Sequence, residues 1–158
     1  MIFVTVGSQK FQFNRLLKEI DRLVEEKKIN EELFAQIGYS DYEPKNYKFK
    51  KFLDRGEFFN IMSECDKVIT HGGTGAIIGA AKKGKKIIAV PRLKIFGEHV
   101  DDHQLQIIEE FRRMNFIKSV NKIEELNEVI NNVDSFKFDK YESNTNVIIK
   151  SIDNFISS

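Results

Sequence analysis

The sequence contains few of the features that mark secreted, membrane-spanning or nucleic-acid-binding proteins. Its single cysteine, Cys65, cannot form a disulfide within the chain, which favours a reducing, cytoplasmic setting. No run of about 18 apolar residues is present, and the first residues lack the basic region of a secretory signal. The 25 Lys and Arg nearly balance the 24 Asp and Glu, and the net charge of +1 disfavours a broad nucleic-acid-binding surface.

Several short motifs of well-known enzyme classes are also missing. The sequence has neither the G-x-x-x-x-G-K-[ST] string of a P-loop nor the G-x-S-x-G string around a nucleophilic serine. Gly7-Ser8-Gln9 follows the first apolar run but is too sparse in glycine for the G-x-G-x-x-G dinucleotide motif. P-loop phosphoryl transfer and nicotinamide chemistry, including that of a sugar-nucleotide epimerase, are therefore disfavoured.

Apolar runs alternate along the chain with segments of helical periodicity. The expected strands span residues 2–6, 32–37, 47–52, 67–70, 86–90 and 115–120. The expected helices span residues 13–27, 58–65 and 76–83, a segment that starts at Asp101 or Asp102, and residues 123–133 and 146–155. This alternation predicts one α/β domain over residues 1–158, with a doubly wound parallel sheet and helices on both faces. Ligands of such folds bind at the carboxyl ends of the strands, so a site is expected in the loops there.

The stretch His71-Gly72-Gly73-Thr74-Gly75 joins an expected buried strand to an expected helix. Such a turn leaves backbone N–H groups unpaired at the helix start, where the helix dipole also favours an anion. Small residues let the backbone approach that anion closely. The motif therefore predicts a phosphate-binding turn, and a tight connection without a ligand is the less favoured interpretation.

The segment from Pro91 to Gln104 is a second polar cluster, and it holds two of the three histidines, His99 and His103. Asp102 and Gln104 supply the acceptors and paired donors that suit sugar hydroxyls, so a sugar-binding cluster is one interpretation. A capped helix start with surface charges is the other. A metal site built from His99, Asp102 and His103 is disfavoured, because adjacent side chains on a helix point in different directions. We expect no essential metal and no cofactor.

Other features favour structural roles. Cys65 lies among apolar residues and is expected to be an inert part of the core. Two basic clusters, within residues 45–55 and 82–86, are interpreted as solvated faces, with contact to anionic lipid or an acidic partner as the alternative. Of the residues after the first strand, Gly7, Ser8 and Gln9 can donate to a ligand, whereas the nearby aromatic pair is expected to pack.

Three segments together resemble a known family. They are Val4–Ser8 with Phe11 and Arg15, the turn His71–Gly75, and Pro91–Gln104. Over about residues 1–120 the chain resembles the C-terminal domain of glycosyltransferase family 28, above all its small, split form in bacterial capsule and exopolysaccharide synthesis. It is also similar to the soluble catalytic subunit of the eukaryotic dolichol-pathway N-acetylglucosamine transferase.

This resemblance implies a Rossmann-like domain that forms one half of a GT-B glycosyltransferase and binds a UDP-sugar. It implies a membrane-anchored partner subunit that supplies the acceptor-side half and recruits this chain to the inner face of the membrane. The implied reaction is the inverting transfer of a hexose, with β-1,4-galactosyl transfer as the guess, to a lipid-linked saccharide. A non-catalytic interaction module that activates a partner transferase is the alternative hypothesis.

The resemblance also implies roles for single residues. The diphosphate of the donor would face Gly72, Gly73, Thr74 and Gly75, with His71 beside it as the candidate catalytic residue. The donor hexose would contact Asp102 and Gln104, with His99 and His103 nearby. The cleft on the acceptor side would be lined by Gly7, Ser8 and Gln9.

The chain departs from the family pattern at Gly79, where fused members carry a carboxylate taken to hold the ribose. No residue of this chain is identified as the general base, which the partner could supply. Half of a two-domain enzyme also exposes its cleft wall, so an apolar surface is expected there. The candidates for this surface are Phe11, Phe13, Phe96 and the C-terminal helix, and the chain alone could self-associate through it.

Overall fold

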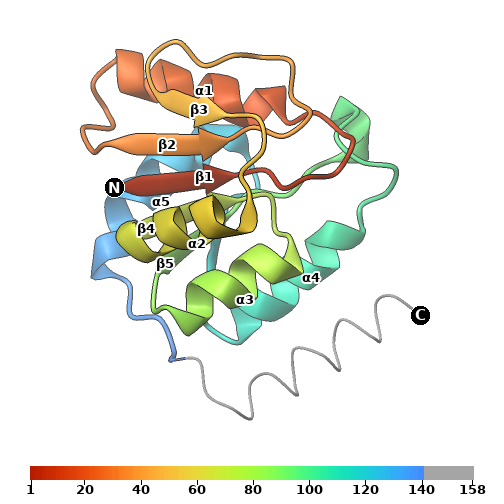
Figure 1. The fold of residues 1–158 in the computed structure, drawn as a ribbon. Coiled ribbons are helices and arrows are strands. Elements are labelled where there is room, and N and C mark those ends of the chain that lie inside the picture. Colours follow the sequence, from red (N-terminus) through yellow and green to blue (C-terminus); the bar gives the residue numbers. More distant parts are fainter. Residues whose placement is uncertain (141–158) are drawn as a thin grey trace.

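The computed structural model describes residues 1–140, except for the side chain of His103. Over these residues it contains six strands, which form one parallel sheet in the order β3-β2-β1-β4-β5-β6 (Figure 1). This is the doubly wound, Rossmann-like sheet that the alternating pattern predicts. Each strand is shorter than expected or equal to it: β1 Ile2–Thr5, β2 Leu33–Gln36, β3 Lys48–Lys50, β4 Lys67–Thr70, β5 Lys86–Ala89 and β6 Lys118–Ser119.

The helices agree with the sequence pattern in number and order as far as residue 140. They are α1 Asn14–Glu25, α2 Arg55–Glu64, α3 Thr74–Lys82, α4 His103–Arg113 and α5 Leu126–Asn132. Short 3₁₀ turns flank α5 at Ile123–Glu125 and Val133–Ser135, and another, η1, spans Lys94–Phe96. The helix expected at 146–155 lies outside the described residues.

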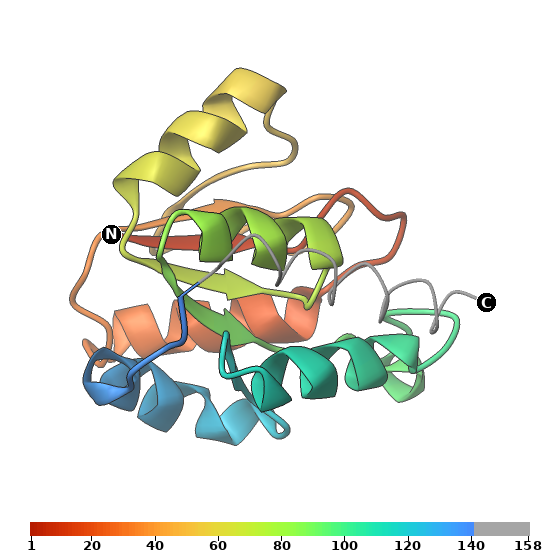
Figure 2. The same cartoon turned by 90° about the horizontal axis from the view of Figure 1, so that it is seen from below.

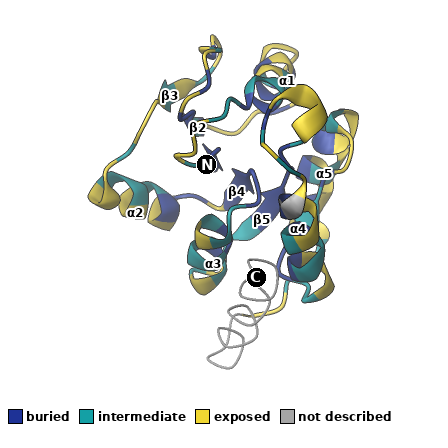
Figure 3. Cartoon of the chain, turned by 90° about the vertical axis from the view of Figure 1, so that its right-hand side faces the viewer, coloured by how far each residue is buried: buried dark blue, intermediate teal, exposed yellow. Residues whose placement is uncertain are grey.

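Two apolar cores cover the two faces of the sheet. The buried residues of α1 recur at helical spacing and pack with α5 on one face, whereas α2, α3 and α4 supply the core of the other. Figure 2 shows α1 and α5 on the side of the sheet opposite to α2 and α3. In Figure 3 the central strands are buried inside these helices. All four residues of β1 and of β4 are buried, as expected for central parallel strands covered on both faces.

Cys65 and the basic cluster at 82–86, which the sequence assigns to structural roles, have such roles in the fold. Cys65 is completely buried in the second core, and burial raises the pKa of its thiol. Within the basic cluster at 82–86, the ammonium groups of Lys83 and Lys85 donate to Ser63 at 2.9 and 3.0 Å, and that of Lys86 pairs with Asp134 at 2.6 Å. These contacts favour the interpretation of a solvated, internally paired face. No helix within residues 1–140 is long and apolar enough to cross a membrane.

Helix starts were the weakest part of the sequence prediction. Helix α2 begins at Arg55 rather than Phe58, because Asp54 and Glu57 cap it reciprocally: Glu57 N–H donates to Asp54 Oδ1 at 2.8 Å and Asp54 N–H donates to Glu57 Oε1 at 3.3 Å. Asp102 does occupy the cap position of α4, but its side chain makes no capping bond there. Its carboxylate instead accepts a 3.1 Å hydrogen bond from Lys94 N–H.

A buried arginine joins the loops at the carboxyl edge of the sheet. The side chain of Arg92, just after β5, is completely buried, and its Nη1 donates to the carbonyl oxygens of Phe11, Gln12 and Glu98 at 2.7, 3.1 and 3.3 Å. Its Nη2 donates to the carbonyl oxygen of Val6. Burial lowers the pKa of Arg92 to about 10, so the group stays charged at neutral pH. One side chain thus holds the β1–α1 loop against the β5–α4 loop.

A buried carboxylate completes this arrangement. Glu98 is fully buried, accepts two 3.0 Å hydrogen bonds from Arg15 of α1, and accepts a third from Leu93 N–H at 2.9 Å. Phe13 is also fully buried and lies under the Arg92 guanidinium, 5.2 Å from ring centre to Cζ. The proposal of Phe13 as part of an exposed cleft wall is therefore wrong, because packing around the buried arginine takes up its ring. Phe96 remains half exposed.

We predict that Arg92→Met destabilises the protein by about 3–5 kcal/mol, because the substitution leaves four backbone carbonyl groups, those of Val6, Phe11, Gln12 and Glu98, without their buried donor. The midpoint and slope of urea unfolding measure this loss. Arg112→Met is the matched control, since Arg112 is an exposed α4 residue that pairs with Glu109 on its own helix, and it should change stability by less than about 0.5 kcal/mol. Equal midpoints for the two variants would contradict the role given to Arg92.

Candidate functional site

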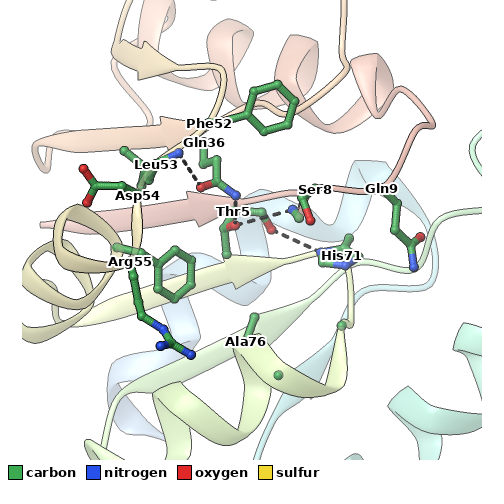
Figure 4. A pocket seen from close by; sticks show the side chains of 14 residues that line it. Thr5, Ser8, Gln9, Gln36, Phe52, Leu53, Asp54, Arg55, His71 and Ala76 are labelled. Carbon is green, nitrogen blue, oxygen red and sulfur yellow. Dashed lines mark hydrogen bonds between the residues drawn. The ribbon is translucent and has the colours of Figure 1, made fainter.

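A pocket of about 460 Å³ lies at the carboxyl edge of the sheet, where β1 and β4 are neighbours. The chain leaves these two strands in opposite directions, so this is the topological switch point at which doubly wound folds bind ligands. Figure 4 shows side chains from four connections around it. They are the β1–α1 loop at Thr5 and Gly7–Gln9, the end of β2 at Gln36, the β3–α2 turn at 52–55 and the β4–α3 turn at 71–76. Gly7, Ser8 and Gln9 therefore meet His71, Gly73 and Gly75 in one pocket, whereas Gly72 and Thr74 of the predicted turn do not line it.

Two helices begin at this pocket, and only one presents an open N-terminus to it. The start of α2 is closed by the reciprocal bonds of Asp54 and Glu57. At the start of α3 no described side chain caps Gly73, and the first turn holds no acidic residue. The N–H groups and the positive dipole end of α3 are therefore available to an anion, whereas those of α2 are already compensated.

The three glycines of the turn differ in whether the surrounding atoms leave room for a side chain. Gly72 has φ +91°, and a Cβ there would lie 2.5 Å from Cδ1 of Ile108 on α4. A Cβ on Gly73 would lie 2.6 Å from Nε2 of His71. Gly75 has ordinary helical geometry, lines the pocket, and a Cβ there would meet no atom within 4 Å. Packing of the turn thus requires the first two glycines, while the third leaves the pocket open.

His71 is buried between the ends of the two central strands. Its Nδ1 lies 3.4 Å from the Thr5 carbonyl oxygen and 3.3 Å from Thr70 Oγ1. Because the Thr5 carbonyl can only accept, Nδ1 carries the proton in this contact and Nε2 is the acceptor nitrogen. A Cβ on Gly7 would lie 2.7 Å from the imidazole ring, which therefore fills the space between the two loops. Burial, and then the charge of Arg92, lowers the pKa of His71 to about 4, so the ring is neutral at physiological pH.

Gln36 is a site residue that the sequence analysis missed. It is buried, donates from Nε2 to Thr5 Oγ1 at 3.3 Å and accepts from Leu53 N–H at 3.0 Å. These bonds fix the turn that carries Phe52, whose ring is 45% exposed, lines the pocket and packs edge-on against Tyr39 at 5.1 Å. The sequence feature that could have indicated this residue is its place as a polar side chain at the end of an otherwise apolar strand.

Of the residues expected to hold a sugar, His99, Asp102 and Gln104 do not line this pocket. The Asp102 carboxylate bonds to Lys94 N–H, and His99 Nδ1 lies 3.3 Å from Asp101 Oδ1 while its ring packs 5.3 Å from that of Phe11. Gln104 is only 7% exposed, and its Oε1 has no hydrogen-bond partner among the described residues. The side chain of His103 is outside the described set. Their assignment to the donor hexose stays a prediction.

The two histidines of this segment do not share a helical face. His99 and His103 are four residues apart, but α4 begins only at His103, so His99 lies on the preceding loop. Among the side chains that the structure describes, no group of three or more His, Cys, Asp or Glu residues is placed to hold a metal ion.

Comparison with known proteins assigns the family. Residues 1–157 match the model of the glycosyltransferase family 28 C-terminal domain. The chain belongs to this family. A curated relative is the UDP-N-acetylglucosamine transferase subunit ALG13 of Candida albicans, which is 32% identical over 88 residues. That alignment covers 56% of this family 28 chain and 28% of the Candida protein.

Solved structures share the fold of this family 28 chain. The kitacinnamycin glycosyltransferase superimposes with a TM-score of 0.64 at 15% identity over 96% of this chain and 37% of its own. MurG of Acinetobacter baumannii gives 0.57 at 20% identity over 82% of this chain and 40% of its own. An NMR structure of ALG13 gives 0.57 at 17% identity, covering 88% and 87% of the two chains. The chain thus spans about two fifths of the two larger transferases and most of the ALG13 structure.

We predict that Gly72→Ala destabilises the protein by at least about 2 kcal/mol, because the methyl group meets Ile108 and the positive φ disfavours any side chain. Gly75→Ala is the matched variant and should change stability by less than about 1 kcal/mol, since nothing obstructs its methyl group. Thermal unfolding of both variants measures the difference. If both glycines tolerated alanine equally, the packing account of the turn would be wrong.

We also predict that the buried neutral imidazole of His71 makes the protein less stable in acid. Its pKa is about 4 in the folded state and about 6.5 when unfolded, so the unfolded chain alone takes up the proton. Stability is therefore lost as pH falls from about 6.5 to about 4, by about 3 kcal/mol in total. Urea unfolding of wild type and His71→Asn at several pH values tests this. The variant should lack this part of the slope, and parallel pH profiles would contradict the prediction.

Proposed function

We propose that this chain is the donor-binding, catalytic subunit of a two-component inverting glycosyltransferase. The observation that carries the proposal is the uncapped start of α3, which opens into a pocket at the switch point of a glycosyltransferase family 28 domain. The exposed N–H groups there suit the diphosphate of a nucleotide sugar, and they would stabilise the charge that develops on UDP as it leaves. No metal or cofactor is part of the proposal.

The two ends of the pocket suit the two ends of such a donor. On one side the half-exposed ring of Phe52 and the turn held by Gln36 offer a flat, apolar wall for a uracil base. On the other side Gly7, Ser8 and Gln9 line the pocket toward the remaining half of the enzyme. Gln104 does not line the pocket, but its buried Oε1 has no hydrogen-bond partner among the described residues, and we propose that a hydroxyl of the donor hexose bonds to it. The donor hexose is proposed to be galactose, transferred in β-1,4 linkage.

The acceptor is proposed to reach this site through a membrane-anchored partner subunit. The chain spans 37% of the kitacinnamycin glycosyltransferase, and the Candida relative is named as a subunit. The loop tied down by Arg92 exposes Ile95, Phe96 and Val100 beside the cleft, and these apolar side chains suit a protein partner. The partner would supply the general base and the lipid-linked saccharide of capsule or exopolysaccharide synthesis, and would recruit this cytoplasmic chain to the membrane.

Calorimetric titration with UDP tests the nucleotide site, with Gly75→Ala as the folded variant. Wild type should bind UDP saturably, and the alanine methyl group should weaken binding about tenfold or more by obstructing the start of α3. Co-purification with a membrane-anchored partner, followed by a screen of UDP-sugars, then tests transfer. If millimolar UDP gives no heat with and without the partner, the chain is a non-catalytic module that activates another transferase.

A further inference from the structure

The wall of the pocket carries one arginine, Arg55, that takes part in none of the hydrogen bonds and ion pairs that stabilise the site. Arg55 is the first residue of α2 and lines the same pocket as Gly73, Gly75 and Ala76. Figure 4 shows its side chain extending from the start of α2 toward Ala76, in the first turn of α3. The residue is exposed, and it forms no hydrogen bond or ion pair with another residue in the described part of the chain.

The acidic neighbours of Arg55 are occupied elsewhere. Asp54 accepts the capping bond of Glu57 N–H, and Glu57 returns that bond and also pairs with Lys50 Nζ at 2.7 Å. Arg55 is therefore not neutralised within the pocket. Among the lining residues it is the only lysine or arginine, and His71, the nearest alternative, is neutral. The side chain is a positive charge held beside an open helix N-terminus of the same sign.

Two cationic features face one cavity in which the single acidic lining residue, Asp54, already serves as the cap of α2. This arrangement favours an anionic ligand between them. The face of α3 next to the cavity is also bare. Gly75 and Gly79 lie one turn apart on it, and a Cβ at either position would meet no atom within 4 Å. A long side chain from α2 can therefore lie over this face, where a side chain on α3 itself would otherwise reach a bound nucleotide.

We propose that Arg55 binds the diphosphate of the nucleotide donor, and that its guanidinium closes the pocket from the α2 side while the N–H groups of α3 bind from the other. This inference rests on the proposed function. On this wall the donor would be bound through its phosphates by an ionic hydrogen bond from Arg55, because α3 carries no carboxylate at Gly79 to bind the ribose. Affinity should then depend on phosphate charge and on salt concentration more than on the ribose hydroxyls.

Calorimetry of UDP and uridine binding to the full chain tests this assignment. Arg55→Ala should weaken UDP binding about tenfold or more, as expected for the loss of one charge-assisted hydrogen bond, and should leave uridine binding unchanged. Arg55→Lys should recover part of the loss, because it restores the charge without the planar group. Lys51→Ala is the matched control, since Lys51 is an exposed cation of the same connection that does not line the pocket.

The possible results distinguish an error in the role of Arg55 from an error in the proposed nucleotide site. If wild type binds UDP and Arg55→Ala binds it equally well, the role of Arg55 is wrong and the nucleotide site stands. If Arg55→Ala weakens UDP and uridine alike, the residue shapes the pocket and the phosphate contact is overturned. If Lys51→Ala weakens UDP binding as much as Arg55→Ala does, the effect comes from the net charge of the protein, and the direct contact is overturned. A wild type that does not bind UDP overturns both proposals.

Discussion

The buried guanidinium of Arg92 is the interaction on which the geometry of the site depends. Loops at the edge of a sheet have no strand partners for their carbonyl groups, and here one side chain supplies donors to four of them. Burying a charge is costly unless its donors are bonded. Both terminal nitrogens of Arg92 are bonded only while the two loops keep their positions, and its Nε has no partner among the described residues. Glu98 and Arg15 extend the same network to α1. The β1–α1 loop is consequently fixed where it forms one wall of the pocket.

The pocket differs from its surroundings in holding positive charge that no described residue balances, at the start of α3 and at Arg55. Side chains and backbone satisfy one another at α2, around Gln36 and around His71, so these parts act as scaffold. At the start of α3 and at Arg55 positive potential remains without a partner among the described residues. An open helix N-terminus and an unpaired cation at the same cavity together favour an anionic ligand. The contrast between two helix starts in one cavity is more informative than either would be alone.

The sequence predicts most of the strands and helices and the turn at residues 71–75, and each prediction that was wrong or missing has a specific physical cause. The strands were found because buried parallel strands are continuous apolar runs, and the turn at residues 71–75 was found because its small residues follow such a run. Gln36 and Arg92 were missed as structural residues because their partners are backbone groups distant in sequence. Phe13 was wrongly a candidate for an exposed surface, because an aromatic residue at the start of a helix carries no sign of what covers it. The early start of α2 was missed although Asp54 and Glu57 have the spacing of a capping box.

The sequence by itself determined the alternation of parallel strands and helices, and with it the edge of the sheet at which a ligand is expected, whereas the strand order came from the structure. Periodicity and small residues are local properties, and they act before any distant contact forms. Only the tertiary structure decided which glycines are required by packing, which helix start is open, and that Arg55 faces the same cavity as Gly75. Those properties depend on where residues far apart in the chain come together, and burial of Arg92 and His71 in that arrangement sets their charge as well.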